Sequence, residues 1–214
     1  DSLVIVYASH PRFNPWFVWK ALLAAHAAGV RPVIIRNKTD ITEGAEDAER
    51  FLESLKTLGY ETHALSAERA DKETLTELDN IFNNHRSLLV GQSGMGKSTI
   101  LNLLVSDANA KTQAYSEALN LGRQTTTVTT LYDLDRAPGF VIDSPGFQEF
   151  GLAHLKASDV IAAMPDIASH TGGCRFANCR HLKEPGCSVK EAVEAGQISL
   201  ERYEFYCAVI ASFD

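Results

Sequence analysis

The sequence has no stretch of about 20 consecutive apolar residues, the length that a membrane-spanning helix needs. Its start, Asp1 to Val6, has neither a basic lead-in nor a cleavage-like site of small residues, so it does not read as a secretory signal. Internal repeats and low-complexity linkers are also missing. An apolar strand pattern close to residue 1 leads us to expect a further segment upstream of this sequence.

A surplus of positive charge is lacking too. The formal net charge is −7, which argues against a surface that coats nucleic acid over its whole extent, although a local basic patch stays possible. Hydrophobic residues make up 45% and charged residues 22%, as in soluble globular proteins. A length of 214 residues allows one core of ordinary domain size and a smaller appendage.

Cysteine is scarce and unevenly placed, because all four lie in the last fifth of the chain. Without an export signal thiols stay reduced, so closely spaced cysteines favour a metal over disulfides. The spacing Cys174-x₄-Cys179-x-His181-x₅-Cys187 supplies three thiolates and one imidazole. This set predicts one closed, structural Zn²⁺ site. Cys207 lies in a helical pattern, and we interpret it as a packed apolar residue.

Strand and helix patterns alternate through the first half of the chain. We expect strands at residues 3–8, 31–35, 62–65 and 87–90, with helices between Pro15 and Gly29, at 45–58 and at 72–83. Two further strand-like segments follow at 128–134 and 139–142. This alternation predicts an α/β domain over residues 1–150, with a mostly parallel sheet and helices on both faces. The strand–helix alternation is absent from residues 151–214. We expect a small α domain there, with a helical pattern from Val189 through Gly196 to Ile210.

Residues 91–98 read G-Q-S-G-M-G-K-S and match the phosphate-binding P-loop. Glycines let backbone N–H groups turn toward phosphate oxygens, and the helix that follows points its positive end at them. We expect Lys97 to reach the β- and γ-phosphates and the Ser98 hydroxyl to ligate Mg²⁺.

Asn37-Lys38-Thr39-Asp40 matches the N-K-x-D guanine-recognition loop of GTPases. The Asp40 carboxylate can accept hydrogen bonds from guanine N1–H and from the exocyclic amine, and adenine offers no such donor pair. A plain turn rich in Asn and Asp is the competing interpretation. Ser66-Ala67, at the end of the next strand, suits the second guanine-contacting loop, although the dipeptide alone carries little information.

Asp143-Ser144-Pro145-Gly146 ends a strand, where an acidic residue can hold Mg²⁺ through water and a glycine amide can meet the γ-phosphate. A simple turn is the alternative. Upstream, Thr125–Thr127 could supply a switch threonine to the metal, or could merely begin a strand. We select Thr126 and expect Lys97, Ser98, Thr126 and Asp143 to be the catalytic set.

These motifs complete one site for GTP or GDP with Mg²⁺. The nucleotide is expected to contact Asn37, Lys38, Thr39, Asp40, Ser66, Ala67, Gly91, Gln92, Ser93, Gly94, Met95, Gly96, Lys97, Ser98, Thr99 and Gly146. In ordinary GTPases the P-loop comes first, whereas here the guanine loop precedes it. A circular permutation restores the full set of strands, and it leads the segment after Gly146 directly into the C-terminal domain.

In this order, and with this cysteine cluster, the sequence resembles the RsgA (YjeQ) family of circularly permuted GTPases that depend on the small ribosomal subunit. The resemblance covers nearly the whole chain. It rests on the motifs at 37–40, 91–98, 122–127 and 143–146, on the cluster of Cys174, Cys179, His181 and Cys187, and on the helix that follows. It implies a bacterial, cytoplasmic factor that acts late in small-subunit maturation, binds ribosomal RNA and is activated as a GTPase by the ribosome. An N-terminal OB-fold domain, usual in the family, has no counterpart here. We expect no membrane partner, and we expect a monomer.

Phe147 stands where Ras-like enzymes place the glutamine that orients water. Because a phenyl ring cannot polarise water, we predict slow turnover by the isolated chain, near the roughly 10⁻⁴ s⁻¹ of an unassisted small GTPase. Arg123, a threonine of the switch loop or the ribosome would supply the missing group.

The segment from Gly172 to Lys190, which contains the cysteine cluster, carries the cations Arg175, Arg180, Lys183 and Lys190 and the carboxylate of Glu184. Such a cluster on an acidic protein is a candidate contact for a phosphate backbone, and a solvated basic loop is the alternative. Two further hypotheses for the whole chain are a P-loop ATPase or kinase, and an RNA-binding scaffold with a vestigial nucleotide site.

Overall fold

The computed structural model describes residues 1–106, 108, 129–144, 150–152 and 154–213 of this protein. Strands and helices alternate as far as α4, as the apolar patterns predicted. In chain order the elements are β1 (Ser2–Ala8), α1 (Pro15–Ala28), β2 (Arg31–Asn37), α2 (Ala45–Thr57), β3 (Glu61–Ala64), α3 (Lys72–Phe82), β4 (Arg86–Gly91), α4 (Lys97–Leu104), β5 (Thr130–Asp133), β6 (Phe140–Asp143), α6 (Ala157–Ala162), α7 (Pro165–Ala168), η1 (Thr171–Gly173), α8 (Ser188–Glu194) and α9 (Leu200–Ala211).

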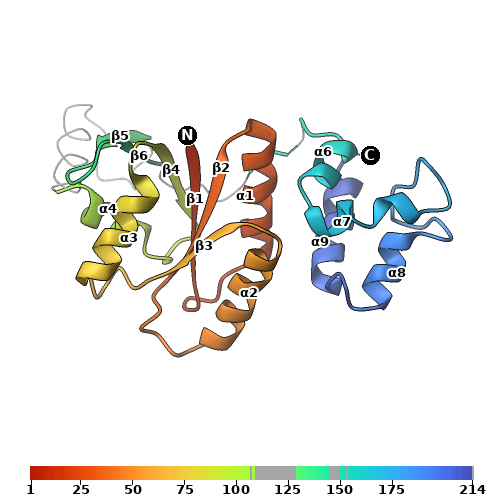
Figure 1. The fold of residues 1–214 in the computed structure, drawn as a ribbon, viewed down its shortest axis with the longest axis horizontal. Coiled ribbons are helices and arrows are strands. Elements are labelled where there is room, and N and C mark those ends of the chain that lie inside the picture. The colour runs from red at the N-terminus through yellow and green to blue at the C-terminus, as the bar shows by residue number, and fades with distance from the viewer. Residues whose placement is uncertain (107, 109–128, 145–149, 153, 214) are drawn as a thin grey trace, which may run out of the picture. The chain divides into compact units, whose positions relative to one another are not determined.

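The six strands form one sheet in the order β3-β2-β1-β4-β6-β5. All neighbours are parallel except β5, which runs antiparallel to β6. Figure 1 shows α1 and α2 on one face of the sheet and α3 and α4 on the other. The chain moves outward from β1 to β3 and then returns to β4 on the other side of β1. The loops after β1 and β4 therefore meet at a switch point, where open parallel sheets bind their ligands.

Local sequence signals account for the elements around this switch point. All seven residues of β1 are buried, as expected of a continuous apolar strand at the centre of a sheet. The side chain of Asn14 caps α1, accepting a hydrogen bond from the Trp16 amide at 2.9 Å, and Pro15 is the first helical residue. After α1 ends, Gly29 adopts φ +63°, a left-handed conformation that favours glycine. The predicted bounds of this helix are confirmed.

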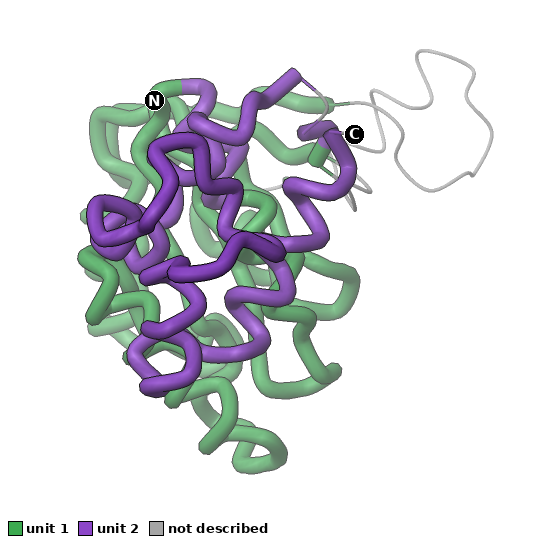
Figure 2. The backbone as a smooth tube through the Cα atoms, turned by 90° about the vertical axis from the view of Figure 1, so that its right-hand side faces the viewer, with its two compact units in different colours: residues 1–21, 29–150 green, residues 22–28, 151–214 purple. Residues whose placement is uncertain are grey.

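The chain divides into two compact units, coloured separately in Figure 2. Unit 1 comprises Asp1–Ala21 and Gly29–Phe150, and unit 2 comprises Leu22–Ala28 and Gly151–Asp214. Within the part of the chain that the structure describes, every helix is too short or too polar to cross a membrane.

Unit 2 contains the helices α6 to α9, of which the sequence patterns predicted only part. The prediction that a helical segment continues from Val189 through Gly196 to Ile210 is wrong, because two separate helices, α8 and α9, form there. Gly196 adopts φ +71° just after α8, and the Ser199 hydroxyl caps α9 by accepting from the Arg202 amide at 3.3 Å. A buried ion pair links α9 to α7, with Arg202 Nε 3.0 Å from Asp166 Oδ2.

Candidate functional site

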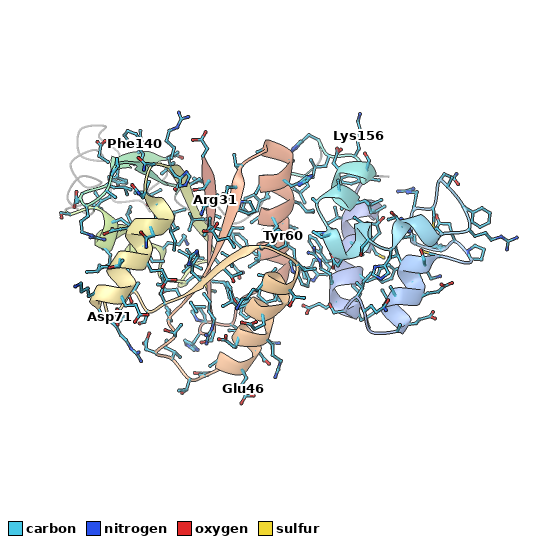
Figure 3. The ribbon with its side chains drawn as sticks, viewed as in Figure 1. Arg31, Glu46, Tyr60, Asp71, Phe140 and Lys156 are labelled. Atoms are coloured by element: carbon cyan, nitrogen blue, oxygen red, sulfur yellow. The ribbon has the colours of Figure 1, made fainter. Side chains whose placement is uncertain are left out.

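The residues predicted to bind the nucleotide, as far as the structure describes them, come together at the carboxyl edge of the sheet. Asn37 ends β2, Gly91 ends β4 and Asp143 ends β6, while Ser66 and Ala67 follow β3. Arg31 and Phe140 begin β2 and β6 at the opposite edge and are labelled in Figure 3. That edge also carries polar side chains, several of which pair with one another. The Arg31 Nε, for example, donates to Glu61 at 2.8 Å.

Asn37 connects three loops of this edge. Its Nδ2 donates to the Met95 carbonyl in the P-loop at 3.0 Å, and its Oδ1 accepts from the Ala67 amide at 3.0 Å. Only 2% of Asn37 is exposed. Because a buried amide that satisfies two main-chain groups is costly to remove, this side chain fixes the guanine loop against the P-loop.

The rest of the guanine loop is fixed by neighbouring segments. The Thr39 amide donates to the Leu65 carbonyl at 3.2 Å, and Lys38, with φ +60°, reaches back to donate from Nζ to the His10 carbonyl at 3.0 Å. The Ser66 hydroxyl donates to the Asp40 carboxylate, and this hydrogen bond lowers the pKa of Asp40. Asp40 is thus held ionised and oriented, while its side chain stays exposed.

Two positions of the P-loop require glycine, because atoms of neighbouring segments lie too close for a Cβ. A Cβ at Gly91 would lie 2.3 Å from the Val6 carbonyl oxygen, and one at Gly96 would lie 2.2 Å from Asn37 Nδ2. Both glycines also have positive φ, +159° and +89°. Side chains at these positions would force the P-loop away from β1 and from the guanine loop.

Lys97 and Asp143 face each other at the phosphate end of the site. Lys97 Nζ donates to the carbonyl oxygens of Gly91 at 2.6 Å and Gln92 at 2.9 Å. Burial lowers the pKa of Lys97 and raises that of Asp143, and the attraction between the two charges opposes both shifts. Among the described residues, no side chain caps the start of α4, so the amides of its first turn, which holds Ser98 and Thr99, are available to anionic oxygens.

The predicted metal ligands cluster in unit 2. The ligand atoms of Cys174, Cys179, His181 and Cys187 all lie within 4.8 Å of one another. His181 Nδ1 is 3.4 Å from the sulfurs of both Cys174 and Cys187, which are 4.0 Å apart. Bonds of about 2.3 Å to sulfur and 2.0–2.1 Å to nitrogen place tetrahedral ligand atoms about 3.5–3.8 Å apart. The donor set and its spacing therefore fit zinc.

Contacts around this cluster hold its ligands in place. Tyr203 and Tyr206 on α9 donate from their hydroxyls to the carbonyls of His181 at 2.6 Å and Arg180 at 3.0 Å. Burial opposes ionisation of Cys174, but its hydrogen bond with the Ser188 side chain and those from the first amides of α8 bring the pKa of this thiol below its usual value. A lowered thiol pKa favours metal binding, because the thiolate is the ligand.

Comparisons with known proteins agree with this geometry. Residues 1–153 match the protein family described as RsgA GTPase. The small ribosomal subunit biogenesis GTPase RsgA of Paraburkholderia xenovorans (strain LB400) is 45% identical over 214 residues, spanning 98% of this chain and 68% of that relative. The chain belongs to the RsgA GTPase family. A second relative, the small ribosomal subunit biogenesis GTPase RsgA of Bordetella pertussis, is 46% identical over 211 residues, which are 98% of this chain and 70% of that protein.

Solved structures support the same assignment to the RsgA family. YloQ, described as a circularly permuted GTPase, superposes with a TM-score of 0.76 at 25% identity, covering 100% of this chain and 68% of YloQ. YjeQ from Thermotoga maritima gives a TM-score of 0.76 at 27% identity, with coverages of 100% and 71%. The expected family and the permuted α/β fold are confirmed. Membership of the RsgA family also argues against an ATPase or kinase.

Several predicted residues lie outside the described part of the chain. They are Arg123, Thr125, Thr126, Thr127, Gly146 and Phe147. Their roles stay predictions. Conversely, sequence patterns did not reveal that Gln92 accepts a hydrogen bond from the Asn14 amide at 2.8 Å, which joins the P-loop to the start of α1. No local pattern encodes this hydrogen bond, because Gln92 is 78 positions from Asn14.

Proposed function

We propose that this chain is a GTPase of small ribosomal subunit biogenesis whose nucleotide lies along the carboxyl edge of the sheet. The activity and the process are those of the RsgA family, to which the chain belongs. The observation that carries the proposed binding site is the double hydrogen bond of Asn37, which joins the guanine loop, the second guanine-contacting loop and the P-loop. The three loops can therefore serve a single ligand.

At the base end, Asp40 would accept hydrogen bonds from guanine N1–H and the 2-amino group. The Ser66 hydroxyl positions this carboxylate and keeps it ionised. Adenine has no such pair of donors, so bound ATP would leave the Asp40 carboxylate without these hydrogen bonds. This mismatch is the basis of the proposed selectivity for GTP.

At the phosphate end, Lys97 and the amides of the P-loop would bind the β- and γ-phosphates. Anionic phosphate would replace the carbonyl partners of Lys97 and stabilise its charged form, which burial now disfavours. Ser98, Asp143 and Thr126 would hold Mg²⁺, whose contribution is to neutralise phosphate charge. This arrangement would position GTP, and the expected slow unassisted turnover rests on Phe147, which stands where Ras-like enzymes place the water-orienting glutamine.

We further propose that residues 1–150 act as the GTPase domain and residues 151–214 as the zinc-binding domain. One structural zinc, held by Cys174, Cys179, His181 and Cys187, would fix the loops that connect these four ligands. The proposed partner is the small ribosomal subunit with its RNA, in the cytoplasm. Stimulation by this partner would compensate for the missing water-orienting group.

Two substitutions test the nucleotide site. Asp40→Asn should lower the affinity for GTP about 100-fold or more, yet favour xanthosine triphosphate, because the new amide can donate to the 2-oxo group. Lys97→Ala should abolish turnover while the chain stays folded. Equal affinities of the unaltered chain for GTP and ATP would contradict the proposal. So would a Lys97→Ala variant that keeps its biological activity, which would favour a scaffold with a vestigial site.

Small ribosomal subunits test the proposed partner. Turnover should start near roughly 10⁻⁴ s⁻¹ for the isolated chain and rise when purified subunits are added. A rate above about 1 s⁻¹ without subunits would contradict the predicted slow turnover of the isolated chain.

A further inference from the structure

An aromatic side chain is exposed on the loop between the first two candidate zinc ligands. Across the described residues, the exposed large apolar side chains are Leu131, Phe176 and Leu200, and Phe176 is 40% exposed. The guanidinium carbon of Arg175 lies 5.5 Å from the centroid of the Phe176 ring, within cation–π range. Arg175 and Phe176 thus form a pair of flat groups at the surface of unit 2.

The backbone that carries this pair is firmly anchored. The Arg175 amide donates to the Gly186 carbonyl at 2.9 Å, and the Cys179 amide donates to the Phe176 carbonyl at 3.1 Å. Cys174 and Cys179, on either side of the pair, belong to the candidate metal cluster. Because the backbone is already ordered, binding of a ligand to the ring costs little conformational entropy of the loop.

The charge around the pair is positive. Between Cys174 and Cys187 the cations are Arg175, Arg180 and Lys183, and the only carboxylate is Glu184. Glu184 accepts hydrogen bonds from the amides of Arg180, Leu182 and Lys183 at 2.9–3.0 Å, and these bonds lower its pKa to about 2. Its negative charge is thus directed into the loop, so this surface is complementary to an anion.

We propose that Phe176 and Arg175 form a stacking platform for an unpaired RNA base, with Lys183 close to the adjoining phosphates. This inference rests on the proposed function at the small ribosomal subunit, an RNA-rich partner. An exposed ring offers a π-face that any unpaired base can stack on, whereas bases within a duplex are already stacked. A lone exposed phenyl ring among cations lacks the broad apolar core of a typical protein interface.

The test measures RNA binding by the zinc-loaded chain with fluorescence anisotropy. The probes are a labelled single-stranded RNA of about ten nucleotides and its duplex. Phe176→Ala and Phe176→Leu should weaken single-strand binding about 5- to 150-fold, the usual range for losing one stacked base. Phe176→Tyr, which keeps an aromatic face, should bind like the unaltered chain. Leu200→Ala is the control, because Leu200 is an apolar residue of the same unit that is even more exposed than Phe176, at 62%.

Salt dependence separates stacking from charge. Lys183→Ala should reduce the slope of log affinity against log salt by about 0.7, whereas Phe176→Ala should leave that slope unchanged. Zinc content and far-UV circular dichroism confirm that each variant is folded. The proposal is overturned if the unaltered chain does not bind single-stranded RNA, or if Phe176→Leu binds it as tightly as the unaltered chain does. It is also overturned if Phe176→Ala weakens duplex binding as much as single-strand binding.

Two further outcomes separate this inference from the proposed function. GTP turnover without ribosomes should be the same for Phe176→Ala and the unaltered chain, whereas Lys97→Ala tests the GTPase proposal independently. If Phe176→Ala impairs stimulation by small subunits but leaves binding to isolated RNA intact, the partner of this surface is a protein and the RNA inference is wrong.

Discussion

Replacing Asn37 by alanine should weaken both the fold of unit 1 and its affinity for nucleotide. The substitution leaves the Met95 carbonyl and the Ala67 amide without their side-chain partner, in residues that are only 1% and 2% exposed. Each buried orphan costs about 1–3 kcal/mol. Allowing for some relaxation around the vacated space, we expect unit 1 to lose about 2–4 kcal/mol of unfolding free energy.

Urea unfolding followed by tryptophan fluorescence suits this prediction, because Trp16 and Trp19 both lie in unit 1. Ser54→Ala is the control, since it removes one exposed hydrogen bond, to the Phe51 carbonyl, in place of two buried ones. The control should change the unfolding free energy by less than about 0.5 kcal/mol. An Asn37→Ala variant as stable as this control would refute the assigned hydrogen bonds.

The same titration with GDP separates a structural role of Asn37 from a role in the site. A ligand at 100 times its Kd stabilises the folded state by about 2.7 kcal/mol. At one fixed GDP concentration this gain should be present in the unaltered chain and nearly absent in Asn37→Ala. A destabilised variant that keeps the full gain would show that the loops bind nucleotide without being joined by Asn37.

Three further predictions follow from the geometry. Gly96→Ala should abolish GDP binding, because its Cβ would lie 2.2 Å from Asn37 Nδ2, whereas Gly151→Ala, with nothing within 4 Å, should bind GDP normally in the same calorimetric titration. Burial raises the pKa of Asp143 in the folded state above its value in the unfolded state. The unaltered chain therefore loses stability as the pH rises from the unfolded-state pKa to the folded-state pKa. Asp143→Asn should therefore unfold at a higher temperature than the unaltered chain at pH 7 and at a similar one at pH 3, although it loses GTP turnover. Chelation of zinc should lower the far-UV helical signal of unit 2 while GDP affinity stays unchanged, since the cluster and the nucleotide residues belong to different units.

Local signals predicted most of unit 1 but less of unit 2. The apolar run of β1 and the cap at Asn14 act through near neighbours, so sequence alone reveals them. The helices α6 and α7 have six and four residues, too few for a periodic apolar pattern to emerge. The break after α8 depends on the left-handed conformation at Gly196, which the surrounding helical pattern concealed.

For the site, sequence identified residue types but not how they are joined. The P-loop and guanine motifs stand out because phosphate and guanine chemistry demands particular side chains at fixed spacing. The partners of Asn37, by contrast, are 58 and 30 positions away, and no local pattern encodes such distances. In the same way, no local pattern shows that the Tyr203 and Tyr206 hydroxyls donate to the carbonyls of His181 and Arg180, 22 and 26 positions away.

The order of strands in the sheet, not their order in the chain, accounts for how a permuted sequence keeps one nucleotide site. In the register of the sheet, Asn37 lies opposite Ala8 of β1, Gly91 lies opposite Val6 of β1, and Asp143 lies opposite Leu89 of β4. With strands about 4.8 Å apart, the end of β2 and the end of β6 are three strand spacings, or about 14 Å, from each other. The guanine loop and Asp143, the aspartate proposed to hold Mg²⁺, therefore lie at opposite ends of the site with the P-loop between them, as a nucleotide bound from base to γ-phosphate requires. Moving the chain ends leaves this arrangement intact, because permutation changes the connections between strands and leaves their neighbours unchanged.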